Sequence, residues 1–143
     1  MRELGEEALR DVLLAALNMS FPSQASGETF NRTGKTDLLV RYGTETAFVG
    51  ECKFWGGEKL FRETVDQLLG HLTSRDLLTA AVIFNRTRDV SAVASKILGC
   101  IREHGRYVED TEVDLVGRRF RFRFKHPRDA GLRLDTAVLL YDL

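Results

Sequence analysis

The sequence lacks any apolar run near the roughly 20 residues that a bilayer-spanning helix needs, so no membrane partner is expected. It contains two cysteines, Cys52 and Cys100, too few for a disulfide framework and without the spacing of a zinc site. It also lacks an excess of either charge, with 21 basic and 21 acidic residues. Without a global basic field, a nucleic-acid partner would have to bind a local patch of the surface.

What is present fits a single globular domain spanning residues 1–143. Hydrophobic residues make up 43% of the chain and charged residues 29%, a balance typical of folded proteins. The first 21 residues are acidic and amphipathic, which disfavours a secretory signal or a transit peptide. Together with the few cysteines, this predicts a protein of the reducing cytoplasm.

The hydrophobic periodicity alternates between helical and strand patterns. Apolar residues at three- and four-residue spacing predict helices, and period-two patterns or short apolar runs predict strands. The expected helices are 3–18, 58–72 and 90–101, and the expected strands are 36–42, 46–55, 77–84, 118–125 and 134–141. This order predicts a layered α/β fold with a mixed central β-sheet flanked by helices.

The first two strands form a predicted hairpin that carries three charged residues. If its loop is centred on Thr44, residues whose numbers add to 88 lie opposite each other, which pairs Asp37 with Glu51. Lys53 lies two residues after Glu51 and therefore on the same face, whereas Cys52 points to the other face. Two carboxylates and an ammonium group are thus expected to converge on one patch.

This combination of charges suits phosphate chemistry. Adjacent carboxylates repel each other unless a cation lies between them, and hard oxygen ligands favour Mg²⁺ or Mn²⁺. A lysine beside such an ion can orient a water molecule and offset charge developing on a phosphate. The arrangement predicts hydrolysis of a phosphodiester. The alternative is a structural cluster in which the three side chains form ordinary ion pairs.

Asp37 in the segment Thr36–Val40, Glu51 and Lys53 fourteen and sixteen residues later, and a following helix with Gln67 resemble the PD-(D/E)xK phosphodiesterase superfamily. Thr36 stands where the proline of the motif's name would be. The resemblance implies a restriction-endonuclease-like fold. It also implies a nuclease that binds Mg²⁺ through Asp37, Glu51 and the carbonyl group of Cys52, with Lys53 as the catalytic lysine.

The same resemblance implies two further site residues. Many members add a glutamate from the first helix, for which Glu6 fits best and Glu7 is the second choice. Some members carry a glutamine at the position of Gln67 and a tyrosine four residues later, where this sequence has His71. Gln67 and His71 could instead belong to a solvated helix flank, and Glu6 could simply stabilise a helix N-terminus.

Two basic segments have alternative interpretations. The stretch Arg118–Lys125 alternates basic residues with phenylalanine, which favours either a strand that tracks phosphates or a charged edge strand. Gly34-Lys35-Thr36 has the ending of a GxxxxGK[ST] phosphate-binding loop but lacks the first glycine of that motif. The acidic group formed by Glu109, Asp110, Glu112 and Asp114 is expected in a solvated loop or at a strand edge.

These observations together predict a metal-dependent nuclease that acts on DNA, since most members of the resembled superfamily cleave DNA. Specificity would then come from a homodimer, a partner or a larger parent protein. Two alternatives stay open: a non-catalytic nucleic-acid-binding module, and a protein-interaction domain whose charges form a salt-bridge network.

Overall fold

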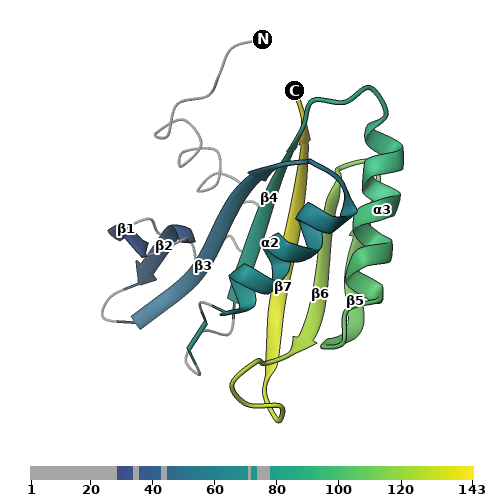
Figure 1. Ribbon diagram of the computed structural model, residues 1–143. Coiled ribbons are helices and arrows are strands. Elements are labelled where there is room, and N and C mark those ends of the chain that lie inside the picture. Colours follow the sequence, from purple (N-terminus) through teal and green to yellow (C-terminus); the bar gives the residue numbers. More distant parts are fainter. Residues whose placement is uncertain (1–28, 34–35, 43–44, 71, 74–77) are drawn as a thin grey trace.

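A computed structural model describes residues 29–33, 36–42, 45–70, 72–73 and 78–143 (Figure 1). Its elements are, in order, β1 (Thr29–Thr33), β2 (Thr36–Tyr42), β3 (Glu45–Phe54), α2 (Glu58–Gly70), β4 (Leu78–Asn85), α3 (Val90–Arg102), β5 (Tyr107–Asp114), β6 (Arg119–Lys125) and β7 (Arg133–Asp142). The predicted first helix, with Glu6 and Glu7, lies outside the described residues, as does His71. The described elements confirm an α/β fold.

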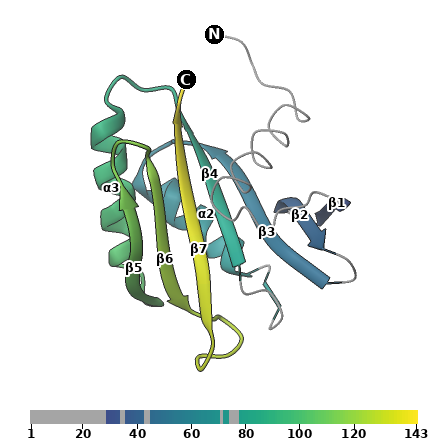
Figure 2. The same ribbon diagram turned by 180° about the vertical axis from the view of Figure 1, so that it is seen from behind.

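All seven described strands form one mixed β-sheet in the order β1-β2-β3-β4-β7-β6-β5. The three central strands β3, β4 and β7 are parallel, and antiparallel strands extend the sheet on both sides. Figure 2 shows β3, β4, β7 and β6 side by side, with the carboxyl end of β7 at the top of the molecule. The parallel centre follows from the helical connections, because a parallel neighbour cannot be reached by a tight turn.

Both described helices cover the same face of this sheet, as Figures 1 and 2 show from opposite sides. The apolar sides of α2 and α3 pack on alternate residues of the strands, which makes one buried core. Phe120, Phe122 and Phe124 of β6 are fully buried members of that core. Their alternation with basic residues therefore reflects one buried strand face, as the period-two pattern predicts.

Strand β6 is not an edge strand, because it lies between β7 and β5. The interpretation of this segment as a charged edge strand is therefore wrong. The edge strand on this side of the described sheet is β5, which contains the acidic group and, among the described strands, pairs only with β6. Its ladder with β6 has two register irregularities, between Tyr107 and Glu109 and between Asp110 and Glu112. Irregularities of this kind discourage pairing with another chain at an exposed edge.

The hairpin of β2 and β3 has the predicted register over its middle. Leu38 lies opposite Gly50, Leu39 opposite Val49 and Val40 opposite Phe48, so the residue numbers add to 88. An irregularity after Val40 shifts the pairing by one residue, and Tyr42 lies opposite Glu45. The turn is therefore one residue tighter than predicted, yet the pairing beyond it is unchanged.

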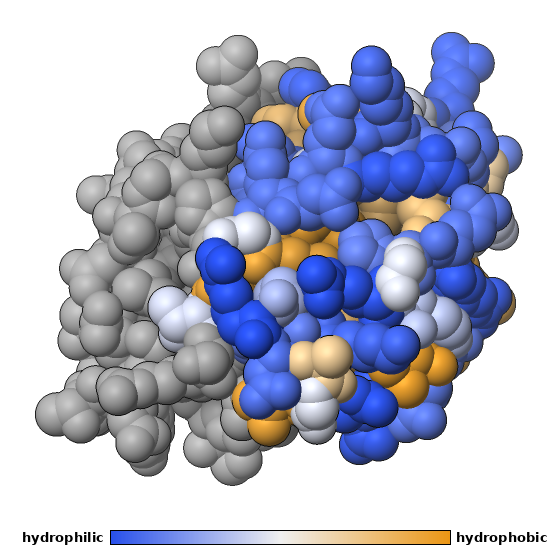
Figure 3. Space-filling model, turned by 60° about the horizontal axis from the view of Figure 1, so that its bottom comes forward, coloured by the Kyte–Doolittle hydropathy of each residue, from blue (hydrophilic) through white to orange (hydrophobic). Residues whose placement is uncertain are grey.

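Viewed from below, the described surface is mainly hydrophilic, and apolar residues are exposed in small separate patches (Figure 3). Scattered apolar residues of this kind are normal on a protein surface and mark no particular partner. Neither α2 nor α3, the helices in the part of the chain that the structure describes, is long and apolar enough to cross a membrane.

Candidate functional site

Glu51 and Lys53 meet on one face of strand β3. The Lys53 Nζ atom lies 3.6 Å from the Glu51 Oε1 atom. The Glu51 side chain is fully buried, whereas 41% of the Lys53 side chain remains exposed. The two residues therefore form an ion pair with a buried negative end and an ammonium group open to solvent, as the period-two spacing predicts.

The register of β3 against β4 shows which face the pair occupies. Glu51 aligns with Ala81 and Lys53 with Ile83 in the parallel ladder, and aligned residues share a face of the sheet. Ala81 and Ile83 belong to the core under α2 and α3. The ion pair therefore lies on the helix-covered face of the sheet, beside α2. Cys52 aligns with Val82 and faces the other side.

The burial of Glu51 has an energetic consequence. A carboxylate removed from water loses its hydration, and only close partners can offset that loss. Lys53 supplies one such partner, but as a partly exposed ammonium group it can also turn toward a ligand. The buried carboxylate of Glu51 suits a bound metal cation, and the exposed ammonium group of Lys53 suits a phosphate. The pair could therefore bind both together.

The other predicted site residues have different outcomes. Asp37 lies in β2, directly before Leu38, which pairs with Gly50, the residue before Glu51. Gln67 is half-buried on α2 and forms no hydrogen bond within the described part of the chain. Cys52 is half-buried, and Glu6 lies outside the described residues. Among the residues that the structure describes, no group of three or more His, Cys, Asp or Glu could hold a metal ion.

Two basic residues of β6, Arg119 and Arg123, form ion pairs with carboxylates. Arg119 Nη2 lies 3.3 Å from Asp114 Oδ2, and Arg123 Nη1 lies 2.8 Å from Glu109 Oε1 on the neighbouring strand. Arg123 Nε also lies 3.5 Å from Asp135 Oδ1 of β7. These pairs join three strands. They also neutralise the guanidinium groups that would otherwise bind the phosphates of a nucleic acid. They disfavour a phosphate-tracking role for this strand.

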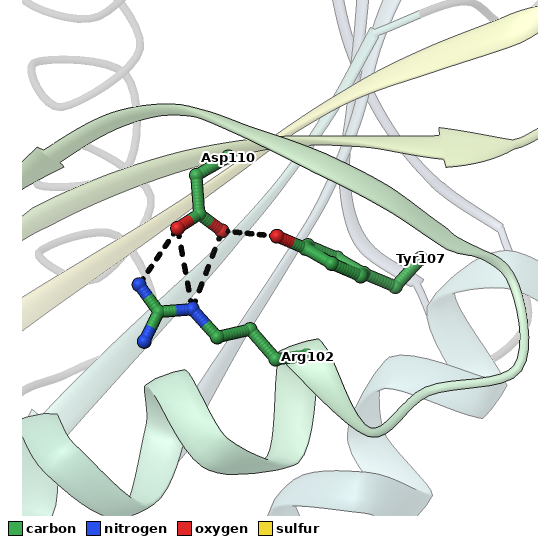
Figure 4. A network of polar contacts seen from close by, with 3 residues as sticks. All are labelled: Arg102, Tyr107 and Asp110. Atoms are coloured by element: carbon green, nitrogen blue, oxygen red, sulfur yellow. Dashed lines mark hydrogen bonds and ion pairs between the residues drawn. The ribbon is translucent and has the colours of Figure 1, made fainter.

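A network of hydrogen bonds that no sequence pattern predicts connects α3 with the edge strand β5 (Figure 4). Arg102 Nη2 donates to Asp110 Oδ2 over 2.6 Å, and the Tyr107 hydroxyl donates to Asp110 Oδ1 over 2.7 Å. The hydrogen bond from Arg102 lowers the pKa of the Asp110 carboxyl, against the opposing effect of burial. Arg102 lies eight residues before Asp110 and Tyr107 three residues before it. No helical or strand period of this segment predicts these contacts.

Cys100 is buried on α3, as the apolar helix pattern predicts. Burial is the main cause that raises the pKa of its thiol above the ordinary value. The thiol therefore stays protonated at neutral pH and is unsuited to nucleophilic chemistry.

Comparison with known proteins finds a similarity of a different kind. Over 114 residues, or 80% of this chain, the sequence is 27% identical to the aliphatic sulfonates import ATP-binding protein SsuB 2 of Rhizobium johnstonii. The chain spans 44% of the length of that relative. No protein-family model and no solved structure matches the chain.

This similarity contradicts the prediction of a metal-dependent nuclease acting on DNA, because the matched protein is an ATP-binding protein. The error has a chemical reason. A carboxylate, a lysine and a divalent cation suit phosphate groups in general, so the same residues fit nucleotides as well as nucleic-acid backbones.

Proposed function

We propose that this chain is a nucleotide-binding domain that holds the phosphate groups of a nucleoside triphosphate at the Glu51–Lys53 pair. The observation that carries the proposal is the buried Glu51 carboxylate 3.6 Å from the partly exposed Lys53 ammonium group. The similarity to an ATP-binding protein supports a nucleotide as the ligand. Lys53 would contact the phosphate oxygens, a role that suits a flexible point charge.

A divalent cation fits the same site by the chemistry of its donors. Mg²⁺ commonly takes one or two carboxylates from a protein and completes its shell with phosphate oxygens and water. Glu51 supplies a buried carboxylate, and Asp37 of β2 is predicted to lie opposite it. These two residues would hold Mg²⁺, whose charge would offset that of the phosphates. Because so few protein ligands are available, the cation should bind tightly only together with the nucleotide.

The segment Gly34-Lys35-Thr36 is the competing phosphate site in this chain. In a phosphate-binding loop this ending leads into a helix, whose N-terminal amide groups face the phosphates. Here Thr36 begins strand β2 instead of a helix. The proposal therefore assigns phosphate binding to Lys53 and not to Lys35.

Calorimetric titration with ATP tests this assignment. We expect binding in the presence of Mg²⁺ and a large loss of affinity in EDTA. Glu51→Gln keeps the side-chain shape and removes its charge, so it should abolish the effect of Mg²⁺. The matched control is Lys59→Ala, which removes an exposed lysine of α2 and should leave the affinity unchanged. Equal affinity in Mg²⁺ and EDTA would refute the role of the cation, and an absence of any ATP binding would refute the proposed function.

We also propose that the scaffold is restriction-endonuclease-like. The core of the resembled superfamily has the order helix, three strands, helix and strand. The described order of three strands, a helix and a strand, from β1 to β4, supports this proposal because it matches the part of that core after the first helix. The proposal concerns the fold alone, since one fold can host unrelated functions.

A further inference from the structure

A cavity of about 370 Å³ lies at the carboxyl end of β7. Its lining consists of Gly117–Arg119, where the chain turns from β5 into β6, and Leu139–Asp142 of β7. The volume is in the range of small-molecule sites. Ligands of open α/β sheets commonly bind outside the carboxyl ends of the parallel strands, and β7 is one of these strands.

The cavity is separate from the Glu51–Lys53 pair. Tyr141 aligns with Phe84 in the parallel ladder, and Phe84 faces the opposite side of β4 from its neighbour Ile83. Ile83 shares its face with Lys53. The Tyr141 side chain therefore lies on the face of the sheet away from α2 and α3, whereas the ion pair lies beside α2.

Arg118 lines this cavity and forms no ion pair with another residue that the structure describes. It has a φ of 55°, in the left-handed region that an arginine rarely adopts. Its carbonyl oxygen accepts a hydrogen bond of 3.0 Å from the Leu140 amide, which fixes this backbone on β7. Within the described residues its guanidinium forms no ion pair, whereas that of Arg119 is paired with Asp114. The backbone of Arg118 is therefore held in one conformation beside the cavity.

The remaining walls favour a ligand with an apolar part. Tyr141 stacks on Phe84 with ring centroids 6.0 Å apart and planes at 28°, which holds its ring in position. Burial raises the pKa of Tyr141, so its hydroxyl remains a hydrogen-bond donor. Leu139 and Leu140 add apolar surface. The Asp142 carboxylate also lines the cavity. Its Oδ1 atom accepts a hydrogen bond of 3.0 Å from the side-chain amide (Nδ2) of Asn85.

We propose that this cavity binds a small organic anion, whose phosphate or carboxylate group pairs with Arg118 and whose apolar part lies against Leu139 and Tyr141. Guanidinium is the side-chain group best suited to a bidentate contact with either kind of anion. The site would act independently of nucleotide binding, because it shares no residue with the Glu51–Lys53 pair.

Two-dimensional amide NMR titrations of the full chain test the proposal with phenyl phosphate, benzoate and phenol as probes. We expect at least one of the two anions to shift the amide signals of Gly117–Arg119 and Leu139–Asp142, with neutral phenol much weaker. A response to phenyl phosphate alone identifies a phosphate ligand, and a response to benzoate alone identifies a carboxylate ligand. No response to either anion, or an equal response to phenol, would overturn the proposal.

Variants separate the role of Arg118 from general charge effects. Arg118→Gly should keep the fold, because glycine accepts a positive φ, and should weaken anion binding about tenfold or more. Arg118→Lys, which keeps the charge, should retain part of the affinity. Arg88→Gly removes an exposed arginine after β4 and is the matched control that should change nothing. Unchanged anion affinity in a folded Arg118→Gly protein would refute the assignment. Lys53→Ala should leave this site intact whether or not the chain binds ATP.

Discussion

Asp110 shows how one side chain can link stability to pH. Its carboxylate accepts hydrogen bonds from Arg102 and Tyr107, and the contact with Arg102 is the main cause of its lowered pKa. A carboxyl group whose pKa is lower in the folded protein than in the unfolded chain stabilises the fold above its unfolded pKa, which is about 3.9 for aspartate. That stabilisation is lost as the pH falls through the lower, folded pKa.

We therefore expect Asp110→Asn to destabilise the protein by about 1 kcal/mol at neutral pH. The difference between the variant and the original protein should begin to shrink below about pH 4, where the unfolded chain takes up a proton at Asp110, and should vanish only below the lower pKa of the folded state. Urea denaturation between pH 3 and pH 7, conditions chosen around that pKa, measures both effects. A destabilisation that stays constant over this range would show that the charge of Asp110 is unimportant.

Arg118 gives a second prediction for a single residue. An L-residue in the left-handed region loses roughly 1 kcal/mol to steric strain, and glycine does not. Because the Arg118 guanidinium forms no ion pair within the described residues, Arg118→Gly should leave stability unchanged or raise it by up to about 1 kcal/mol. Thermal denaturation is the measurement. A clear loss of stability would mean that the arginine side chain makes a stabilising contact that outweighs the strain.

Individual residues were predictable where a local period controlled them. Glu51 and Lys53 share a face because alternate residues of any strand do so, and the sequence alone predicts their proximity. The contacts of Asp110 follow no such period, because they depend on how the chain returns from α3 into β5. The predicted pairing of Asp37 with Glu51 stays a prediction, because the described pairs end one residue away, at Leu38 opposite Gly50.

Among the secondary-structure elements, β5 is a strand that the sequence pattern did not predict. Its sequence, YVEDTEVD, mixes four acidic residues, which strands disfavour, with four β-branched or aromatic residues, which favour strands. It becomes a strand because β6 offers a paired edge with arginines opposite its carboxylates, including Arg119 opposite Asp114 and Arg123 opposite Glu109. This partner lies beyond a turn, so pairing with β6 decides the structure of a segment whose local propensities are mixed.

The start of α3 depends on a cap that can be tested. The Asp89 side chain accepts a hydrogen bond of 3.0 Å from the Ala92 amide, which satisfies one of the free N–H groups at the helix start. Asp89→Ala should destabilise the protein by about 1 kcal/mol, whereas Asp89→Ser should retain most of the stability because serine also caps helices. Chemical denaturation distinguishes them. Equal losses for both variants would argue against the cap.

In the whole molecule, the two proposed ligand sites lie near the carboxyl ends of the parallel strands β3 and β7. Lys53 lies one residue before the end of β3, and the cavity with Arg118 lies at the end of β7. Loops and side chains gather at these carboxyl ends because each parallel strand leaves the sheet there. The two proposed sites thus lie on opposite faces of the sheet, one beside the helices and one away from them.

The α/β class could be predicted from the sequence because its helical and strand periods are strong. The function could not, because a carboxylate pair with a lysine describes a chemistry and not a substrate. The same three residues predicted a nuclease by resemblance, whereas the similarity found over 80% of the chain is to an ATP-binding protein. Residues that recognise a base or a sugar would have narrowed the choice, and no motif in this sequence identifies them.

The most direct test of nucleotide binding at the Glu51–Lys53 pair compares two lysines in one calorimetric titration with ATP and Mg²⁺. Lys53→Ala should weaken ATP binding about tenfold or more, because it removes a charged contact to the phosphates, whereas Lys35→Ala should leave the affinity within about twofold. If Lys35→Ala abolishes binding and Lys53→Ala does not, the phosphates bind at the Gly34-Lys35-Thr36 segment, and the proposed site is wrong.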